Sequence, residues 1–264
     1  MPAASPGIYQ ALGMHLESRL VLPELIQAAP SVEREALVQV VEADHRDWPT
    51  LEVSPHSTPT LQLAPQEWRL ELEGIGWFRA TSGERLEWQR WDDSVSDRDI
   101  RTFAVTSGLG ALAIQRGALV LHGTALERDG EAILLLGHPV AGKSTLAWCL
   151  LQQGWRLLSS ELVAVSPDGL VLPGMHQLKL WHDAAVALEL NWQQLPPVRK
   201  GLKRLVQSSR SSRSTRNRIS PGQQQLPFAL DVRLNQFPEE WHQVAVRFRR
   251  ANGIRDADRE RSDW

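Results

Sequence analysis

Residues 137–145 read Gly-His-Pro-Val-Ala-Gly-Lys-Ser-Thr, and this stretch predicts how the second half of the chain folds. Its spacing fits G-x-x-x-x-G-K-S/T, the pattern of a phosphate-binding loop. In such a loop, consecutive backbone N–H groups and a helix N-terminus surround a phosphate, and glycine lets the backbone approach it closely. The lysine reaches the outer phosphates, and the hydroxyl after it binds Mg²⁺. The residues expected to bind a nucleotide are Gly137, His138, Pro139, Val140, Ala141, Gly142, Lys143, Ser144 and Thr145.

The neighbouring segments supply the context that this loop requires. Ala132–Leu136 is an all-apolar strand, of the kind that is buried on both faces. Ser144–Gln153 carries an apolar stripe typical of a helix, which Gly154 ends. A chance match to the loop pattern is expected roughly once in several hundred such chains. Pro139 removes one N–H donor without preventing binding. The sequence therefore predicts a nucleotide site, with an ordinary glycine turn into a helix as the alternative.

Three further residues are candidates for chemistry on the nucleotide. A phosphate-loop protein generally needs an acid at the end of a neighbouring strand, to hold Mg²⁺ or to position the nucleophile. Glu161 stands among apolar residues expected to form a strand, and the alternative is a surface carboxylate on an edge strand. Asp231, in a predicted strand at Ala229–Leu234, is a weaker second candidate. His122 ends an apolar strand, where a lone histidine is more often a hydrogen-bonded core residue than a catalyst.

A basic segment follows the expected core. Asn191–Leu230 contains no acid, and eight lysines and arginines lie between Arg199 and Arg218. One interpretation is a solvated loop of low complexity. The other is a basic flap that meets phosphate or an acidic partner. RNA binding is disfavoured, because no aromatic residue stands between Arg199 and Arg218 to stack on bases.

The first half of the chain predicts a small β-rich lobe. Short runs such as Met14–Ser18, Leu20–Pro23 and Trp68–Glu73 are typical of strands separated by turns. Val41–Gln66 contains four prolines and little periodicity, so we expect a long loop there. Apolar residues then recur at helical spacing over Asp97–Arg116. Ser96 or Asp97 is expected to cap this helix, and Gly108 and Gly110 weaken its middle.

Composition narrows the class of protein. The 264 residues carry a net charge of -2, which provides no global field for nucleic acid. There is no signal-peptide pattern and no run of 18 apolar residues, so we expect no membrane span. The single cysteine, Cys149, is typical of a reducing compartment, and we expect a cytoplasmic location. Histidines and cysteine form no metal-ligand pattern. Tryptophan is frequent, with 11 residues, and only Lys143, Lys179, Lys200 and Lys203 of the 29 basic residues are lysine.

Beyond the loop itself, several segments resemble one known family. Leu121-His122-Gly123, the loop at Gly137–Thr145, and Gly154–Glu161 resemble the catalytic core of HPr serine kinase/phosphorylase. The chain is more closely similar to the HPr-kinase-related proteins of bacteria. This likeness extends to Leu178-Lys179-Leu180-Trp181, and back to Tyr9–Leu25 and Gln115-Arg116-Gly117, so it covers most of the chain.

The resemblance implies an architecture and an activity. It implies an α/β fold with a P-loop kinase-like catalytic domain of the HPr kinase C-terminal type, over residues 93–250. A small β-rich lobe would precede it at 1–92 and a polar tail would follow at 251–264. The expected ligands are ATP, or another nucleoside triphosphate, and Mg²⁺. The expected reaction transfers phosphate to a serine-type hydroxyl of a protein or peptide, and a homo-oligomer is compatible with the family.

The resemblance also assigns roles to residues. Lys143 would neutralise the β- and γ-phosphates, Ser144 would bind Mg²⁺, and His122 would touch the transferring phosphate. In the family the strand after the loop helix ends in two acids, where this chain has Ser160 and Glu161. A serine cannot take the hydroxyl proton at neutral pH, and in a strand Glu161 would face away from Ser160. Either Glu161 serves as metal ligand or base, or the chain is a nucleotide-binding accessory protein without catalysis. A generic nucleotide hydrolase is a third interpretation.

Overall fold

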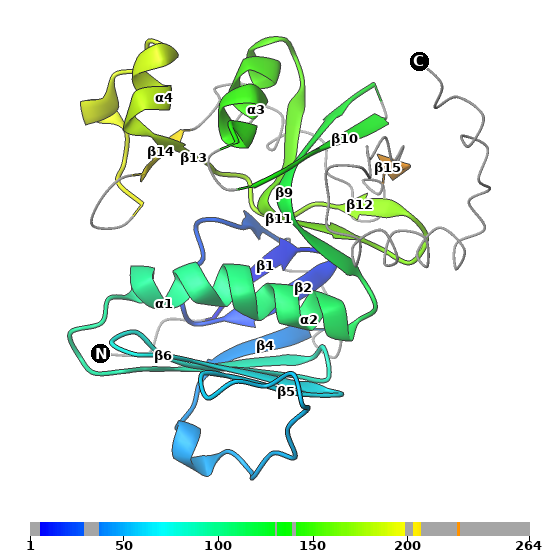
Figure 1. Ribbon diagram of the computed structural model, residues 1–264, viewed down its shortest axis with the longest axis vertical. Coiled ribbons are helices and arrows are strands. Elements are labelled where there is room, and N and C mark those ends of the chain that lie inside the picture. The colour runs from blue at the N-terminus through cyan, green and yellow to red at the C-terminus, as the bar shows by residue number, and fades with distance from the viewer. Residues whose placement is uncertain are drawn as a thin grey trace.

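The computed structural model describes residues 6–28, 37–129, 131–138, 141–198, 203–206 and 226–227. These residues form a mixed α/β protein built mostly of strands, arranged in sheets of eight, five and two strands (Figure 1). No helix among the described residues is long and apolar enough to cross a membrane. Asp231, most of the basic segment at 199–218 and the tail at 251–264 lie outside the described residues.

The first sheet contains the strands of the N-terminal half, in the order β3-β1-β2-β4-β8-β7-β6-β5. β4 lies between β2 and β8 and runs parallel to both, whereas every other pair of neighbouring strands in this sheet is antiparallel. The predicted strand at Met14–Ser18 is confirmed as β2, whereas Leu20–Pro23 is not a strand. The expected loop at 41–66 contains β5, which pairs with β6 across a two-residue turn. The strands are β1 (Gly7–Ala11), β2 (Met14–Ser18), β3 (Ile26–Gln27), β4 (Leu37–Glu42), β5 (Leu61–Ala64), β6 (Glu67–Leu72), β7 (Gly76–Thr81) and β8 (Arg85–Arg90).

One interrupted helix covers this sheet. α1 (Asp97–Phe103) begins at Ser96, whose side chain accepts a hydrogen bond from the Asp99 N–H, and α2 (Leu109–Gln115) follows a π-helical turn at Ala104–Gly108. A Cβ at Gly108 would lie 2.8 Å from the Leu86 side chain, so glycine lets the helix approach β8. α2 contacts β7 and β8 of this sheet and also β9 (Leu119–Arg128) and β11 (Arg156–Val165) of the next (Figure 1). The helix therefore shares its core with the first sheet, although the boundary predicted at 92/93 separates them.

Aromatic rings and arginines cover the opposite face of the first sheet. The centroid of the Trp48 ring lies 5.6 Å from Cζ of Arg69 and 5.9 Å from Cζ of Arg79. Both arginines donate to Glu67, from their Nε atoms to Oε1 at 2.6 Å. Burial alone would raise the pKa of Glu67, but the hydrogen bonds from Arg79 and Arg69 outweigh it and hold this pKa below its usual value. Part of the arginine and tryptophan usage thus stabilises this face.

The second sheet has the order β10-β9-β11-β12-β15, and every pair in it is antiparallel. α3 packs on β9, β10 and β11, and a strand pair with a short helix, β13–β14 and α4, lies beside α3 (Figure 1). Ile133–Leu136 is only half-buried, not buried on both faces as expected, because β10 lies at the edge of this sheet. The elements are β9 (Leu119–Arg128), β10 (Glu131–Leu136), α3 (Lys143–Gln152), β11 (Arg156–Val165), β12 (Leu170–Leu172), β13 (Leu178–Trp181), α4 (His182–Ala187), β14 (Lys203–Val206) and β15 (Leu226–Pro227).

The N-terminal and C-terminal halves of the chain contact each other through hydrogen bonds and through a shared buried apolar cluster. The Leu12 N–H donates to the Pro173 carbonyl at 2.6 Å, and Gln177 Nε2 donates to the Pro23 carbonyl at 2.9 Å. Leu172 and Met175 belong to the same buried cluster as the strands of the first sheet. The segment that leads from β12 into β13 is therefore fixed against the N-terminal half.

His176 lies in this junction, and because it is buried we expect the stability of the protein to depend on pH. Burial lowers the pKa of His176 to about 4, against a weaker opposing hydrogen bond with the Leu157 backbone. Its stabilising contribution is complete above pH 6.5, where the unfolded chain is also neutral, and is lost as the pH falls towards 4. Between pH 7 and pH 5 we expect the free energy of unfolding to fall by about 2 kcal/mol from this residue. Urea unfolding at both pH values measures it.

His176→Gln should remove this component, whereas His56→Gln, at an exposed histidine, should retain it. An equal pH dependence in wild type and His176→Gln would show that His176 is not the source.

Candidate nucleotide site

The phosphate-loop segment leads directly into α3. Gly142 is the N-cap residue of this helix, with φ of 84°, and its carbonyl accepts the Leu146 N–H at 2.8 Å. Among the described residues, apart from the chain neighbours of Gly142 and the backbone of α3, no atom lies within 4 Å of where a Cβ of residue 142 would be, so the left-handed backbone and not crowding requires glycine here. Gly137, at the other end of the loop, has φ of 148°. Pro139 and Val140 lie outside the described residues.

Lys143 lies over its own loop. Its Nζ donates to the Gly137 carbonyl at 2.7 Å and to the His138 carbonyl at 2.8 Å. The ammonium therefore links the first turn of α3 to the start of the loop. The first turn of any helix also leaves backbone N–H groups without intrahelical acceptors, and these favour an anion. Together they make a site of positive potential at the N-terminus of α3.

β9 forms a second wall, with His122, Gly123 and Thr124. A Cβ at Gly123 would lie 2.6 Å from the Leu136 side chain and 2.8 Å from the Leu135 carbonyl oxygen. The glycine after His122 is therefore required by the close passage of β10. His122 is exposed, as a core histidine would not be, and Thr124 is buried.

β11 carries Ser160 and Glu161, whose side chains lie in different surroundings. The Ser160 side chain is buried, and its Oγ donates to the Gln177 carbonyl at 2.6 Å and lies 3.3 Å from that of Met175. Glu161 instead lies at the cavity described below. Its φ of 64° is unusual for a residue inside a strand, and the Ser159 hydroxyl donates to the Leu162 carbonyl across this kink. Such strained backbone costs about 1–3 kcal/mol and concentrates at functional sites.

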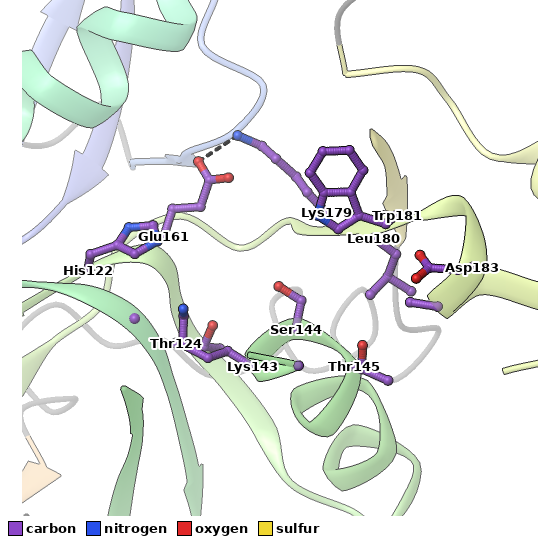
Figure 2. A pocket seen from close by; sticks show the side chains of 13 residues that line it. His122, Thr124, Lys143, Ser144, Thr145, Glu161, Lys179, Leu180, Trp181 and Asp183 are labelled. Carbon is purple, nitrogen blue, oxygen red and sulfur yellow. Dashed lines mark hydrogen bonds and ion pairs between the residues drawn. The ribbon is translucent and has the colours of Figure 1, made fainter. Parts of the chain in front are cut away.

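β13 and α4 form the remaining wall. Leu178 and Leu180 are buried, and Lys179 alternates with them along the strand. Lys179 Nζ donates to Glu161 Oε2 at 2.6 Å, as Figure 2 shows. The Lys179 side chain is 11% exposed and that of Glu161 is 24% exposed, so water screens this ion pair only in part.

The N-terminus of α3, β9, β11, β13 and α4 together line a cavity of about 170 Å³ that is open to solvent (Figure 2). It is smaller than the roughly 300–1,000 Å³ of a pocket for a whole small molecule. The described residues therefore suit the phosphate end of a nucleotide better than a complete one. Lysines and carboxylates both face it, and it is lined by His122, Gly123, Thr124, Gly142, Lys143, Ser144, Thr145, Glu161, Lys179, Leu180, Trp181, Asp183 and Ala184.

The oxygen donors in the cavity fit Mg²⁺ shared with phosphate. No group of three or more His, Cys, Asp and Glu residues in the described part of the chain could hold a metal by itself. Mg²⁺ usually takes one or two protein oxygens together with substrate phosphates, and keeps water for the rest. The Ser144 hydroxyl and the Glu161 carboxylate, both at the cavity, are donors of this kind. The residues present therefore fit a magnesium ion that arrives with a nucleotide.

The structure brings together most of the residues that the sequence singled out. His122, Glu161 and Gly142–Thr145 line the cavity, whereas Gly137, His138 and Ala141 are described but are not among its lining residues. Sequence reasoning missed Thr124, Lys179 and Asp183 as site residues. The scarcity of lysine and the family-like Leu-Lys-Leu-Trp were signals for Lys179, and neither Thr124 nor Asp183 had one.

Comparisons with models of protein families, with curated proteins and with solved structures found no match to this chain.

Proposed function

We propose that the chain binds a nucleoside triphosphate such as ATP with Mg²⁺ and transfers its terminal phosphoryl group to a serine-type hydroxyl of a protein or peptide. The shared cavity carries this proposal. A lysine and a hydroxyl at the N-terminus of α3 face the same space as a carboxylate on β11 and a histidine on β9. Phosphoryl transfer depends mainly on positioning and on neutralising charge, and these residue types supply both.

Each residue has a defined task in the proposed reaction. The α3 N-terminus and Lys143 hold the phosphates, and His122 lies where it can donate to the transferring group. The acceptor oxygen bonds to the γ-phosphorus while the bond to the β–γ bridging oxygen breaks, and the nucleoside diphosphate leaves with that electron pair. The hydroxyl proton passes to Glu161, or to water when Glu161 is a metal ligand. Mg²⁺, when bound, would neutralise phosphate charge.

A second candidate function is a nucleotide-binding accessory or regulatory protein without catalysis. Two observations favour it. Ser160 faces backbone carbonyls and not the cavity, and the Glu161 carboxylate is paired with Lys179 through one oxygen. Neither observation weakens binding of phosphate at the α3 N-terminus. Both candidate functions therefore predict that the nucleotide binds, and they differ in whether its phosphate is transferred.

The fate of the γ-phosphate distinguishes these functions. The assay supplies γ-labelled ATP, Mg²⁺ and a library of peptides that each contain one serine, with Lys143→Ala as the matched control. Label on peptides in wild type alone supports the kinase. Release of phosphate without labelled peptide supports a hydrolase, and ATP binding without either product supports the accessory protein. Absence of ATP binding contradicts all three.

A further inference from the structure

Two of the four lysines in the chain line the same cavity from different walls. Lys143 begins α3 and Lys179 lies in β13, while arginine supplies all but four of the 29 basic residues. An arginine holds a carboxylate or phosphate with a rigid fork, whereas lysine is a compact charge with three rotatable donors. Lysine at both positions therefore suits groups that exchange one oxygen partner for another.

The partner of Lys179 is the carboxylate that the proposed function needs for metal or proton. The 2.6 Å bond occupies Glu161 Oε2, and the Lys179 side chain is only 11% exposed. The Glu161 carboxylate lies at the cavity that Ser144 also lines, on a backbone with φ of 64°. A metal ion shared between Ser144 and Glu161 would be repelled by the adjacent ammonium, and the two cations would share the one negative charge of the carboxylate. Metal binding therefore weakens the pair between Lys179 and Glu161.

We propose that Lys179 is a second phosphate-binding lysine, which pairs with Glu161 in the free protein and turns to the terminal phosphate when Mg²⁺ and nucleotide enter. This inference rests on the proposed nucleotide function and adds a residue to it. The ammonium stays inside the cavity in both states, so it is never left without an anionic partner. Lys143 neutralises the phosphates from the loop side and Lys179 from the β13 side.

A purely structural ion pair makes different predictions from this exchange. If the bond only ties β13 to β11, its removal lowers stability and leaves ligand affinities alone. If Lys179 competes with metal and contacts the terminal phosphate, its removal changes two affinities in opposite directions. Metal alone should bind more tightly because Glu161 is freed, and triphosphate should bind more weakly because one cation is lost.

The test compares wild type with Lys179→Met, which keeps a flexible, unbranched side chain of similar length and removes its charge. The probes are Mn²⁺ alone, followed by electron paramagnetic resonance, and Mg-ATP and Mg-ADP, followed by calorimetry. For Lys179→Met we expect Mn²⁺ affinity to rise several-fold and Mg-ATP affinity to fall about tenfold or more. Mg-ADP affinity should change less than twofold, because the diphosphate lacks the terminal group.

Lys179→Arg keeps the inference testable if Lys179→Met does not fold. Its guanidinium retains the pair with Glu161 but holds it with two parallel bonds. We therefore expect wild-type stability with several-fold weaker binding of Mn²⁺ alone. Unchanged affinities in the folded variants, with wild type binding Mg-ATP, would overturn the role of Lys179 and leave the proposed function intact. Wild type that fails to bind Mg-ATP would overturn both.

Discussion

Replacing Glu161 with glutamine is expected to lower phosphoryl transfer by about 10²–10⁴-fold, the usual contribution of a positioned acid or base. Glutamine keeps the size of the side chain and removes the negative charge, whether that charge serves Mg²⁺ or the acceptor proton. The phosphate loop and Lys143 are untouched, so Mg-ATP affinity should change by less than about tenfold. Steady-state transfer and calorimetric binding on the same preparation separate the two effects.

Glu161→Gln also removes the anionic partner of Lys179, so the free energy of unfolding of this variant has to be measured separately. The glutamine carbonyl still accepts the hydrogen bond, and we expect a loss of about 1–2 kcal/mol from the part-exposed pair. Glu131→Gln is a matched control, because Glu131 is an exposed carboxylate at the start of β10. Its turnover should equal that of wild type. Wild-type turnover in Glu161→Gln would remove Glu161 from the reaction.

Introducing an acid at the buried position 160, as Ser160→Asp, is expected to destabilise the protein by about 3 kcal/mol or more. Ser160 is 3% exposed, and its hydroxyl donates towards the carbonyls of Met175 and Gln177. An aspartate would place a carboxylate against two acceptors that cannot donate to it. For a chain of this size, such a loss lowers the melting temperature by about 6–12 °C. Scanning calorimetry measures it.

The same geometry predicts that Ser160→Asp gives no gain in turnover, since residue 160 does not line the cavity. Ser160→Ala is the matched control: it loses the hydroxyl bond without adding charge and should cost about 1 kcal/mol. The penalty of Ser160→Asp should also shrink as the pH approaches 4, where the carboxyl is protonated and can donate. A variant as stable as wild type with raised turnover would show that residue 160 can reach the site.

The local parts of the site could be predicted from the sequence, because they depend on neighbours in the chain. The glycines at 137 and 142 follow from the positive φ angles that one loop and one helix start require. The strand that carries Glu161 follows from its apolar neighbours. What the sequence could not show is the kink at Glu161, across which the Ser159 hydroxyl donates to the Leu162 carbonyl.

Contacts between distant segments could not be predicted either, because they depend on how segments far apart in the sequence pack together. Lys179 reaches Glu161 only because β13 folds back beside α3. Arg69 and Arg79 lie over the ring of Trp48, which belongs to the segment 41–66 that was expected to be a plain loop. The amphipathic pattern at 97–116 predicted a helix but not that α2 packs against both sheets, since such a pattern shows which face is buried but not what buries it.

Titration of Mg-ATP against wild type and Lys143→Ala tests the central claim most directly. Lys143 spans the loop through the carbonyls of Gly137 and His138 and faces the cavity, so its ammonium is available to exchange these oxygens for phosphate oxygens. We predict that wild type binds Mg-ATP and that Lys143→Ala binds it at least about tenfold more weakly, at equal folded content by circular dichroism. Equal affinity of the two proteins, or no binding by wild type, would contradict a phosphate site at the start of α3.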